Sequence, residues 1–234
     1  MFLMFLISEW VLQLDHWYGG GFCAIDFVDT MNGWVCGDYG TIYRTRDGGW
    51  TWERQTTGDI LTFNGISFID TLRGWICGDA GYIARTDDGG KTWVKQNSGV
   101  KSTLYDIVFI DERHGWCGSY REILRTIDGG RIWEPVLSDS GWCRNISPVN
   151  RNIVWASVLF SGVYVSYDGG INWVKKKDLK SHHCVFAVNE RVIYISSSNG
   201  YLYKSTDGGE TFDSFPRPSA DISCALFFVS DNEG

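Results

Sequence analysis

The triplet Asp-Gly-Gly recurs five times along the chain, and this recurrence constrains the fold more than any other feature. Its aspartates are Asp47, Asp88, Asp128, Asp168 and Asp207, at spacings of 41, 40, 40 and 39 residues. A second landmark keeps the same phase in the first three repeats: Gly33-Trp34, Gly74-Trp75 and Gly115-Trp116. Self-similarity at a period of about 40 residues, with several short strands per unit, is typical of β-propeller blades.

One repeat divides into four short strands separated by turn residues. In the second repeat the expected strands are 66–70, 75–78, 82–86 and 92–96. The turns between them contain Asp and Gly, which favour tight hairpins. No segment shows the apolar spacing of a helix. The sequence therefore predicts an all-β protein, a β-propeller of four-stranded antiparallel blades.

The repeat also sets the expected boundaries. We predict a single propeller domain over 1–234, with five complete blades at about 22–57, 63–98, 104–137, 143–177 and 183–215. Residues 8–13 match the fourth strand of a blade, so they predict the outer strand of a preceding or closing blade. Residues 222–234 resemble a first strand and predict an incomplete next blade. Because this unit stops within the motif, we expect a segment of a longer propeller of the seven-bladed type.

Charge and hydropathy exclude two classes of partner. The formal net charge is −7, which is opposite to the basic surface that nucleic-acid phosphates need. No stretch reaches the ~18 apolar residues of a membrane helix, so we expect a protein that does not span a membrane. The apolar start, residues 1–7, lacks the positive region and cleavage site of a signal peptide.

The seven cysteines are expected to be free core residues. Cys36, Cys77 and Cys117 each precede a glycine at the same point of the repeat. Equivalent positions of successive blades are expected to lie too far apart to pair, and small apolar packing is the usual role of such thiols. The chain has no paired ligand spacing of a zinc site. We therefore expect no metal and no cofactor.

The residues around each triplet suit a turn better than a reaction. The aspartate can accept hydrogen bonds from its own turn, the glycine supplies positive φ, and the hydroxyl and the aromatic ring close the hairpin. Five carboxylates spread around a ring cannot converge on one substrate, and each turn has too few acids for Ca²⁺. These structural residues are Thr45, Asp47, Gly49, Trp52, Thr86, Asp88, Gly90, Trp93, Thr126, Asp128, Gly130, Trp133, Ser166, Asp168, Gly170, Trp173, Ser205, Asp207, Gly209 and Phe212. No catalytic residue is predicted.

These turns resemble the Asp-box, or bacterial neuraminidase repeat, of sialidases, sortilins and related propellers. The longer unit is similar to the repeat of the photosystem II assembly and stability factor family. The first two repeats match it nearly throughout, from Phe27 to Trp52 and from Phe68 to Trp93. The third repeat keeps Arg125 but replaces a turn by 119–122, and the last two keep little beyond the Asp-box.

The resemblance implies an exported, non-catalytic propeller, in the periplasm, thylakoid lumen or at the cell surface, that binds a protein partner. In a phototroph that partner is a photosystem II subunit; elsewhere it is open. Two alternatives remain. One is a sialidase-like or other glycoside hydrolase, although the Phe-Arg-Ile-Pro motif of sialidases is absent. The other is a structural or adhesion module of a larger secreted or cell-surface protein.

Candidate partner-binding residues fall in two groups. The B–C turns and the crossovers between blades share the face opposite the Asp-boxes, and variable loops on a rigid scaffold often carry recognition. They contain Tyr39, Tyr120, Arg121, Trp142, His182 and His183. Arg44, Arg85 and Arg125, with Lys204, recur just before the Asp-box and predict a basic surface patch, a feature of the photosystem family.

Overall fold

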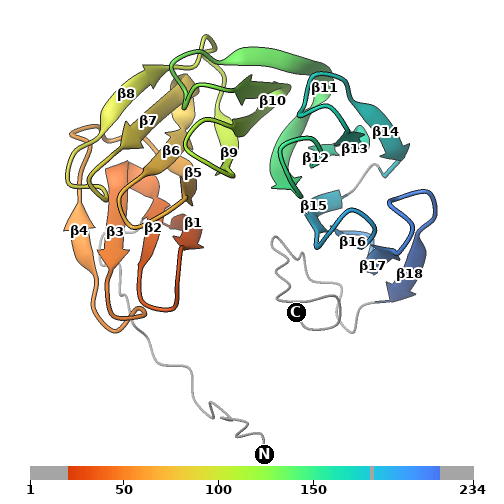
Figure 1. The fold of residues 1–234 in the computed structure, drawn as a ribbon, viewed down its shortest axis with the longest axis horizontal. Helices are drawn as coiled ribbons and strands as arrows, with labels where there is room; N and C mark the ends of the chain where they lie inside the picture. The colour runs from red at the N-terminus through yellow and green to blue at the C-terminus, as the bar shows by residue number, and fades with distance from the viewer. Residues whose placement is uncertain (1–20, 180–181, 217–234) are drawn as a thin grey trace, which may run out of the picture.

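The computed structural model describes residues 21–179 and 182–216, and within them the protein is built from β-strands. The strands form antiparallel sheets that follow one another around an arc, with β1, β5, β9 and β15 toward its centre (Figure 1). This arrangement confirms the predicted all-β propeller architecture. The strands expected at 8–13 and 222–234 lie outside the described residues.

The first two sheets are regular four-stranded blades. Blade 1 consists of β1 (Phe22–Phe27), β2 (Gly33–Gly37), β3 (Thr41–Thr45) and β4 (Glu53–Gln55). Blade 2 consists of β5 (Phe63–Phe68), β6 (Gly74–Gly78), β7 (Tyr82–Thr86) and β8 (Val94–Asn97). Short 3-10 turns, η1 (Asp38–Gly40) and η2 (Asp79–Gly81), connect the second and third strands. Each blade is ordered as the chain runs, from the innermost to the outermost strand.

Blades 3 and 4 differ from the prediction of separate four-stranded sheets, because they share one six-stranded sheet of order β14-β13-β12-β11-β10-β9. Its strands are β9 (Leu104–Phe109), β10 (Gly115–Thr126), β11 (Glu134–Pro148), β12 (Val154–Leu159), β13 (Gly162–Ser166) and β14 (Val174–Lys177). The first part of β11 pairs with β10 and its second part with β12. The outer strand of blade 3 thus continues as the inner strand of blade 4, whereas a loop separates these two strands at the other blade boundaries.

The strand β10 contains a chain reversal. Gly129 N–H donates to Arg113 C=O, so the segments just before and just after β10 lie next to each other. The first half of β10 pairs with β9 and the second half with β11. Arg121, between the halves, has a φ of 76°. No Asp-x-Gly turn is present here, because residues 119–122 read Ser-Tyr-Arg-Glu.

Blade 5 is again four-stranded, with β15 (His182–Ala187), β16 (Ile193–Ser197), β17 (Tyr201–Ser205) and β18 (Asp213–Pro216). The hydrophobic core lies between the blades. Between blades 1 and 2, for example, Trp34 stacks on Phe68 with ring centroids 3.6 Å apart, beside the buried Cys36 and Ile42. The next two interfaces each contain an equivalent tryptophan, Trp75 and Trp116.

The cysteines pack in these interfaces. Cys36, Cys77, Cys117, Cys143 and Cys184 are buried, whereas Cys23 is exposed. Burial raises the pKa of Cys77 and Cys117, which lie close enough for their side chains to interact. Equivalent thiols of neighbouring blades are therefore nearer than the repeat spacing suggested. Among residues 21–179 and 182–216, no helix has the length and apolar character needed to cross a membrane.

Candidate partner-binding site

The five Asp-box turns share one hydrogen-bond pattern. In the second, the Thr86 hydroxyl donates to Asp88 Oδ1 at 2.9 Å and accepts from Gly90 N–H at 2.8 Å. Asp88 also accepts from the amide and the hydroxyl of Thr92, at 2.9 and 2.7 Å. Gly90 has a φ of 90°, and a Cβ there would lie 2.0 Å from Gln55 Oε1. Each carboxylate is thus occupied by its own turn.

The same bonds set the acidity of these carboxyl groups. In the first turn the hydroxyl and the amide of Thr51, followed by the Thr45 hydroxyl, lower the pKa of Asp47 to about 2. A group with such a pKa is ionised at neutral pH and does not act as a general acid. The pKa of each of the five Asp-box carboxyl groups is lowered in this way, which does not suit a general acid.

Replacing Asp88 by alanine should lower the free energy of unfolding by about 1–3 kcal/mol, because three hydrogen bonds to the carboxylate are lost. The adjacent Asp87, whose carboxylate bonds the Arg85 side chain at the surface, is a matched control. Asp87→Ala should change stability by about 0.5 kcal/mol or less. Chemical denaturation measures both variants, and equal effects would contradict the structural role of Asp88.

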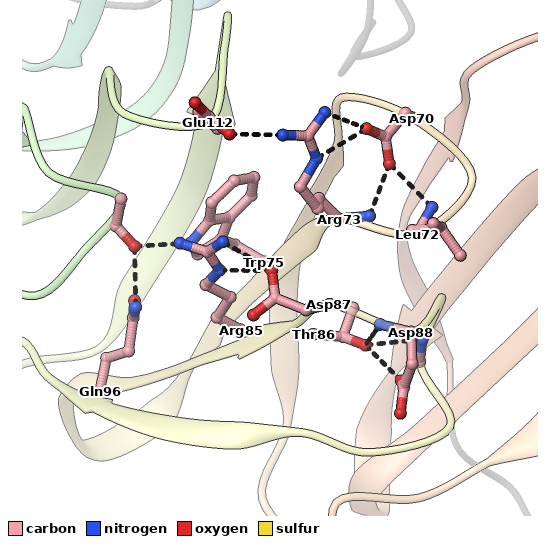
Figure 2. Close-up of polar contacts among 12 residues, drawn as sticks. Asp70, Leu72, Arg73, Trp75, Arg85, Thr86, Asp87, Asp88, Gln96 and Glu112 are labelled. Atoms are coloured by element: carbon pink, nitrogen blue, oxygen red, sulfur yellow. Dashed lines mark hydrogen bonds and ion pairs between the residues drawn. The ribbon is translucent and has the colours of Figure 1, made fainter.

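The arginines before the Asp-boxes lie at the interfaces between blades. One carbonyl, that of Gly89, accepts from Trp34 Nε1 at 3.2 Å, an Arg44 guanidinium N–H at 3.0 Å and Gln55 Nε2 at 2.9 Å. In the next interface Gly129 C=O accepts from Trp75 Nε1 at 3.1 Å and Gln96 Nε2 at 2.8 Å. Figure 2 shows Trp75, Arg85 and Gln96 side by side at this interface.

This placement differs from the expected surface patch. Arg44 is only 6% exposed, and its guanidinium lies over the Trp34 ring, 4.8 Å from the centroid. Arg85 is half-buried over Trp75 and is paired with Asp87. Arg125 is also half-buried, and a guanidinium nitrogen lies 3.6 Å from a Cβ built on Gly169 of the next Asp-box. These side chains point between blades because the stacked tryptophan and the acceptor carbonyl lie there.

The inner strands line a central cavity of about 420 Å³. Asp26 and Asp106 both reach it, which bears on the glycoside hydrolase alternative. Asp26 Oδ2 accepts from Phe68 N–H at 2.6 Å, and Asp106 Oδ2 accepts from Ile146 N–H at 2.7 Å. Burial raises the pKa of Asp106 to about 6, against the opposite effect of the Ile146 and Ile107 backbone donors. Each carboxylate is therefore directed at the next blade, as a link between inner strands.

Away from the Asp-boxes, four aromatic rings and two arginines form one cluster, which we call the aromatic–arginine cluster. Trp142 is its centre, with ring centroids at 6.3 Å from Tyr105, 6.2 Å from Tyr120 and 5.9 Å from Phe160. The Arg144 guanidinium lies over the rings of both Tyr105 and Trp142, at 5.3 and 5.2 Å. Arg121 lies over Tyr120 at 4.9 Å. The structure thus brings three of the predicted residues together.

Strand register places the cluster opposite the Asp-boxes. Tyr120 pairs with Trp142, and Trp142 pairs with Leu159, so three neighbouring strands present residues at one level. Tyr120 lies at the reversal of β10, whose other end leads into the Asp-box at Thr126. Directly paired residues project from the same face of a sheet. Tyr120 and Trp142 therefore project from the same face of the sheet, at the end of the strands away from the Asp-boxes.

A partly buried polar network links the crossover that carries Trp142 to blade 4. Asp139 Oδ2 accepts from the Ser161 hydroxyl at 2.7 Å and the Tyr164 hydroxyl at 2.6 Å. Gly141 N–H donates to Asp139 Oδ1 at 3.2 Å. Phe160, next to Ser161, has a φ of 69° and is 66% exposed. Positive φ is costly for a bulky residue, and the bond from Ser161 N–H to Val158 C=O, at 3.0 Å, closes the turn in which Phe160 adopts it.

Other candidates lie elsewhere. Tyr39 is exposed in η1 of blade 1, two blades from the cluster. His182 and His183 begin β15, and their side chains are outside what the structure describes. Tyr105, Arg144 and Phe160 were not predicted from the sequence, because the repeat pattern does not show which strand residues lie beside Trp142. Arg144 lies two residues after Trp142, which was the available signal. Among the described residues, no group of three or more His, Cys, Asp or Glu is placed to hold a metal.

This fold and its hairpins define a β-propeller protein. Residues 10–98 match the family model described as Photosynthesis system II assembly factor YCF48, which confirms the family resemblance over the first two blades. A search of curated protein sequences found no match.

Solved propellers resemble the chain at low identity. A structure of YCF48 bound to a D1 peptide is 21% identical, with 82% of this chain and 80% of that chain covered and a TM-score of 0.50. The GH74 enzyme of Niastella koreensis is 15% identical, with 84% and 38% covered and a TM-score of 0.72. The WD40 propeller domain of Doa1 is 12% identical, with 82% and 70% covered and a TM-score of 0.64. At such identities these likenesses show the fold alone.

Proposed function

We propose that this protein is a non-catalytic propeller that binds a protein partner, in the manner of an assembly factor, on the rim that carries the aromatic–arginine cluster. The observation that carries the proposal is the cluster itself: an aromatic centre with two arginines on a rigid sheet. Aromatic residues and arginine are the types enriched where proteins bind each other. The match of residues 10–98 to the photosystem II assembly factor model supports an assembly role.

We assign the partner and the compartment by that resemblance. In a phototroph the partner is a photosystem II subunit, and the YCF48 structure bound to a D1 peptide supports a peptide as the recognised element. The protein acts in an exported compartment, such as the periplasm or thylakoid lumen. The tested site is the cluster, whereas the half-buried Arg85 and Arg125 and the buried Arg44 serve the contacts between blades.

Titration with a fluorescently labelled D1 peptide tests the proposal. Trp142→Ala should weaken binding by about tenfold or more, because a central aromatic residue at an interface contributes about 2 kcal/mol. Trp50→Ala is the matched control, since Trp50 is 73% exposed on the Asp-box side and should leave binding unchanged. Circular dichroism establishes that both variants are folded. Absence of wild-type binding, or turnover of a fluorogenic sialoside or glucan, would contradict the proposal.

A further inference from the structure

We infer that the aromatic–arginine cluster recognises an extended acidic segment in which carboxylate side chains flank an aromatic side chain. The inference rests on the proposed function for the nature of the partner, a protein, and adds its chemistry. The cluster combines two exposed arginines with the exposed rings of Tyr120 and Phe160, which suits a ligand that is both acidic and aromatic.

Among residues 21–179 and 182–216, neither arginine of the cluster has an acidic partner. Among the described residues, the ion pairs of arginine involve Arg46, Arg73, Arg85 and Arg151, and neither Arg121 nor Arg144. Both cluster arginines are exposed. The chain has a formal net charge of −7 and therefore many carboxylates, but none of the described ones forms an ion pair with these two arginines. Charge complementarity therefore favours an acidic ligand.

Both arginines lie over aromatic rings of the cluster. Arg144 lies over two rings and Arg121 over one. The N–H groups of a guanidinium point outward in its own plane. A guanidinium that lies over a ring can therefore still donate two hydrogen bonds to one carboxylate. The stacking also covers ring faces that a sugar would need. This geometry favours a carboxylate over a carbohydrate.

The remaining aromatic surface accounts for the central side chain of the ligand. Phe160 is 66% exposed and packs edge-on against Trp142, so a ring placed beside it would bury apolar area on both. Tyr120, Trp142 and Leu159 lie on three adjacent strands. Strands are spaced by about 4.8 Å and an extended chain rises about 3.3 Å per residue, so a few residues span the cluster.

The test uses short blocked peptides and the full chain. The first peptide has a phenylalanine between two glutamates, and its isosteric control has glutamines instead. We expect the acidic peptide to bind, with affinity falling as salt is raised, and the glutamine peptide to bind on the order of tenfold or more weakly. Arg121→Gln and Arg144→Gln should each weaken the acidic peptide by about tenfold, whereas the exposed Arg131 of the same blade is the control and Arg131→Gln should have no effect.

Each outcome decides for or against the inference. Equal binding of both peptides, or unchanged binding by the Arg121 and Arg144 variants, would overturn it, as would binding of neither peptide. Self-association of the protein through the cluster, seen as a dimer that these variants abolish, would also overturn it. Binding of the D1 peptide by the double arginine variant with wild-type affinity would leave the proposed function standing while this inference fails. If the acidic peptide binds and the D1 peptide does not, this inference stands and the proposed function fails.

Discussion

Replacing Trp75 by alanine should lower the free energy of unfolding by about 3–5 kcal/mol, in the range measured for buried large-to-small substitutions. The Trp75 indole is fully buried and stacks on Phe109 of the next blade, with centroids 3.6 Å apart and planes 7° from parallel. Arg85 covers the ring at 5.2 Å. For a domain of this size the melting temperature should fall by about 10 °C.

The contribution of the carbonyl bond can be separated from packing by a milder substitution. Trp75→Phe keeps most of the apolar volume but removes the donor to Gly129 C=O. In the next interface but one, Trp155 is equally buried, yet among the described residues its Nε1 has no acceptor. Trp75→Phe should therefore cost about 1 kcal/mol more than Trp155→Phe in urea denaturation. Equal costs would show that the carbonyl bond adds nothing to blade association.

Replacing Asp106 by asparagine should stabilise the protein at neutral pH. Because burial raises the pKa of Asp106 to about 6, above the ~3.9 of an unfolded chain, the folded state binds more protons between these values. Stability therefore falls as the pH rises from about 4 to about 6, and the loss persists above it. An asparagine can still accept from Ile146 N–H without the buried charge. We expect a gain of about 1–2 kcal/mol near pH 7.5, less than the full shift implies because the side chain borders a cavity.

The repeat supplies its own control for this experiment. Asn145 occupies the equivalent place in blade 4 and accepts from Val185 N–H at 2.7 Å. Asn145→Asp should destabilise the protein near pH 7.5 and have little effect near pH 4, the mirror image of Asp106→Asn. Urea denaturation across this pH range compares the two. A less stable Asp106→Asn protein at neutral pH would mean that the ionised carboxylate is favoured, against the role assigned here.

The fold could be predicted from the sequence because its determinants are local and repeated. Asp47, Gly49 and Trp52 specify a hairpin through bonds within nine residues, and the motif then recurs at blade spacing. The six-stranded sheet was not predicted, because it depends on Trp142 pairing with both Tyr120 and Leu159. That pairing joins strands of different repeats at a place where the repeat pattern has decayed.

The candidate site was predicted only in part, for a similar reason. Tyr120 and Arg121 were predicted from a turn and Trp142 from a crossover, but Tyr105 and Phe160 join them only through ring contacts in the folded sheet. Arg44, by contrast, looked like a surface cation. A repeat shows that an arginine recurs, and it does not show that the next blade supplies a carbonyl to receive it. Residues whose role depends on the neighbouring blade are those that sequence reasoning misplaced.

The central claim is that the Asp-boxes hold the blades while recognition occurs on the opposite rim. Titration of folded Asp88→Ala and folded Trp142→Ala with the same D1 peptide tests this most directly. The account predicts that Asp88→Ala, although less stable, binds with wild-type affinity, and that Trp142→Ala binds about tenfold or more weakly. Lost binding by folded Asp88→Ala, together with wild-type binding by Trp142→Ala, would contradict it.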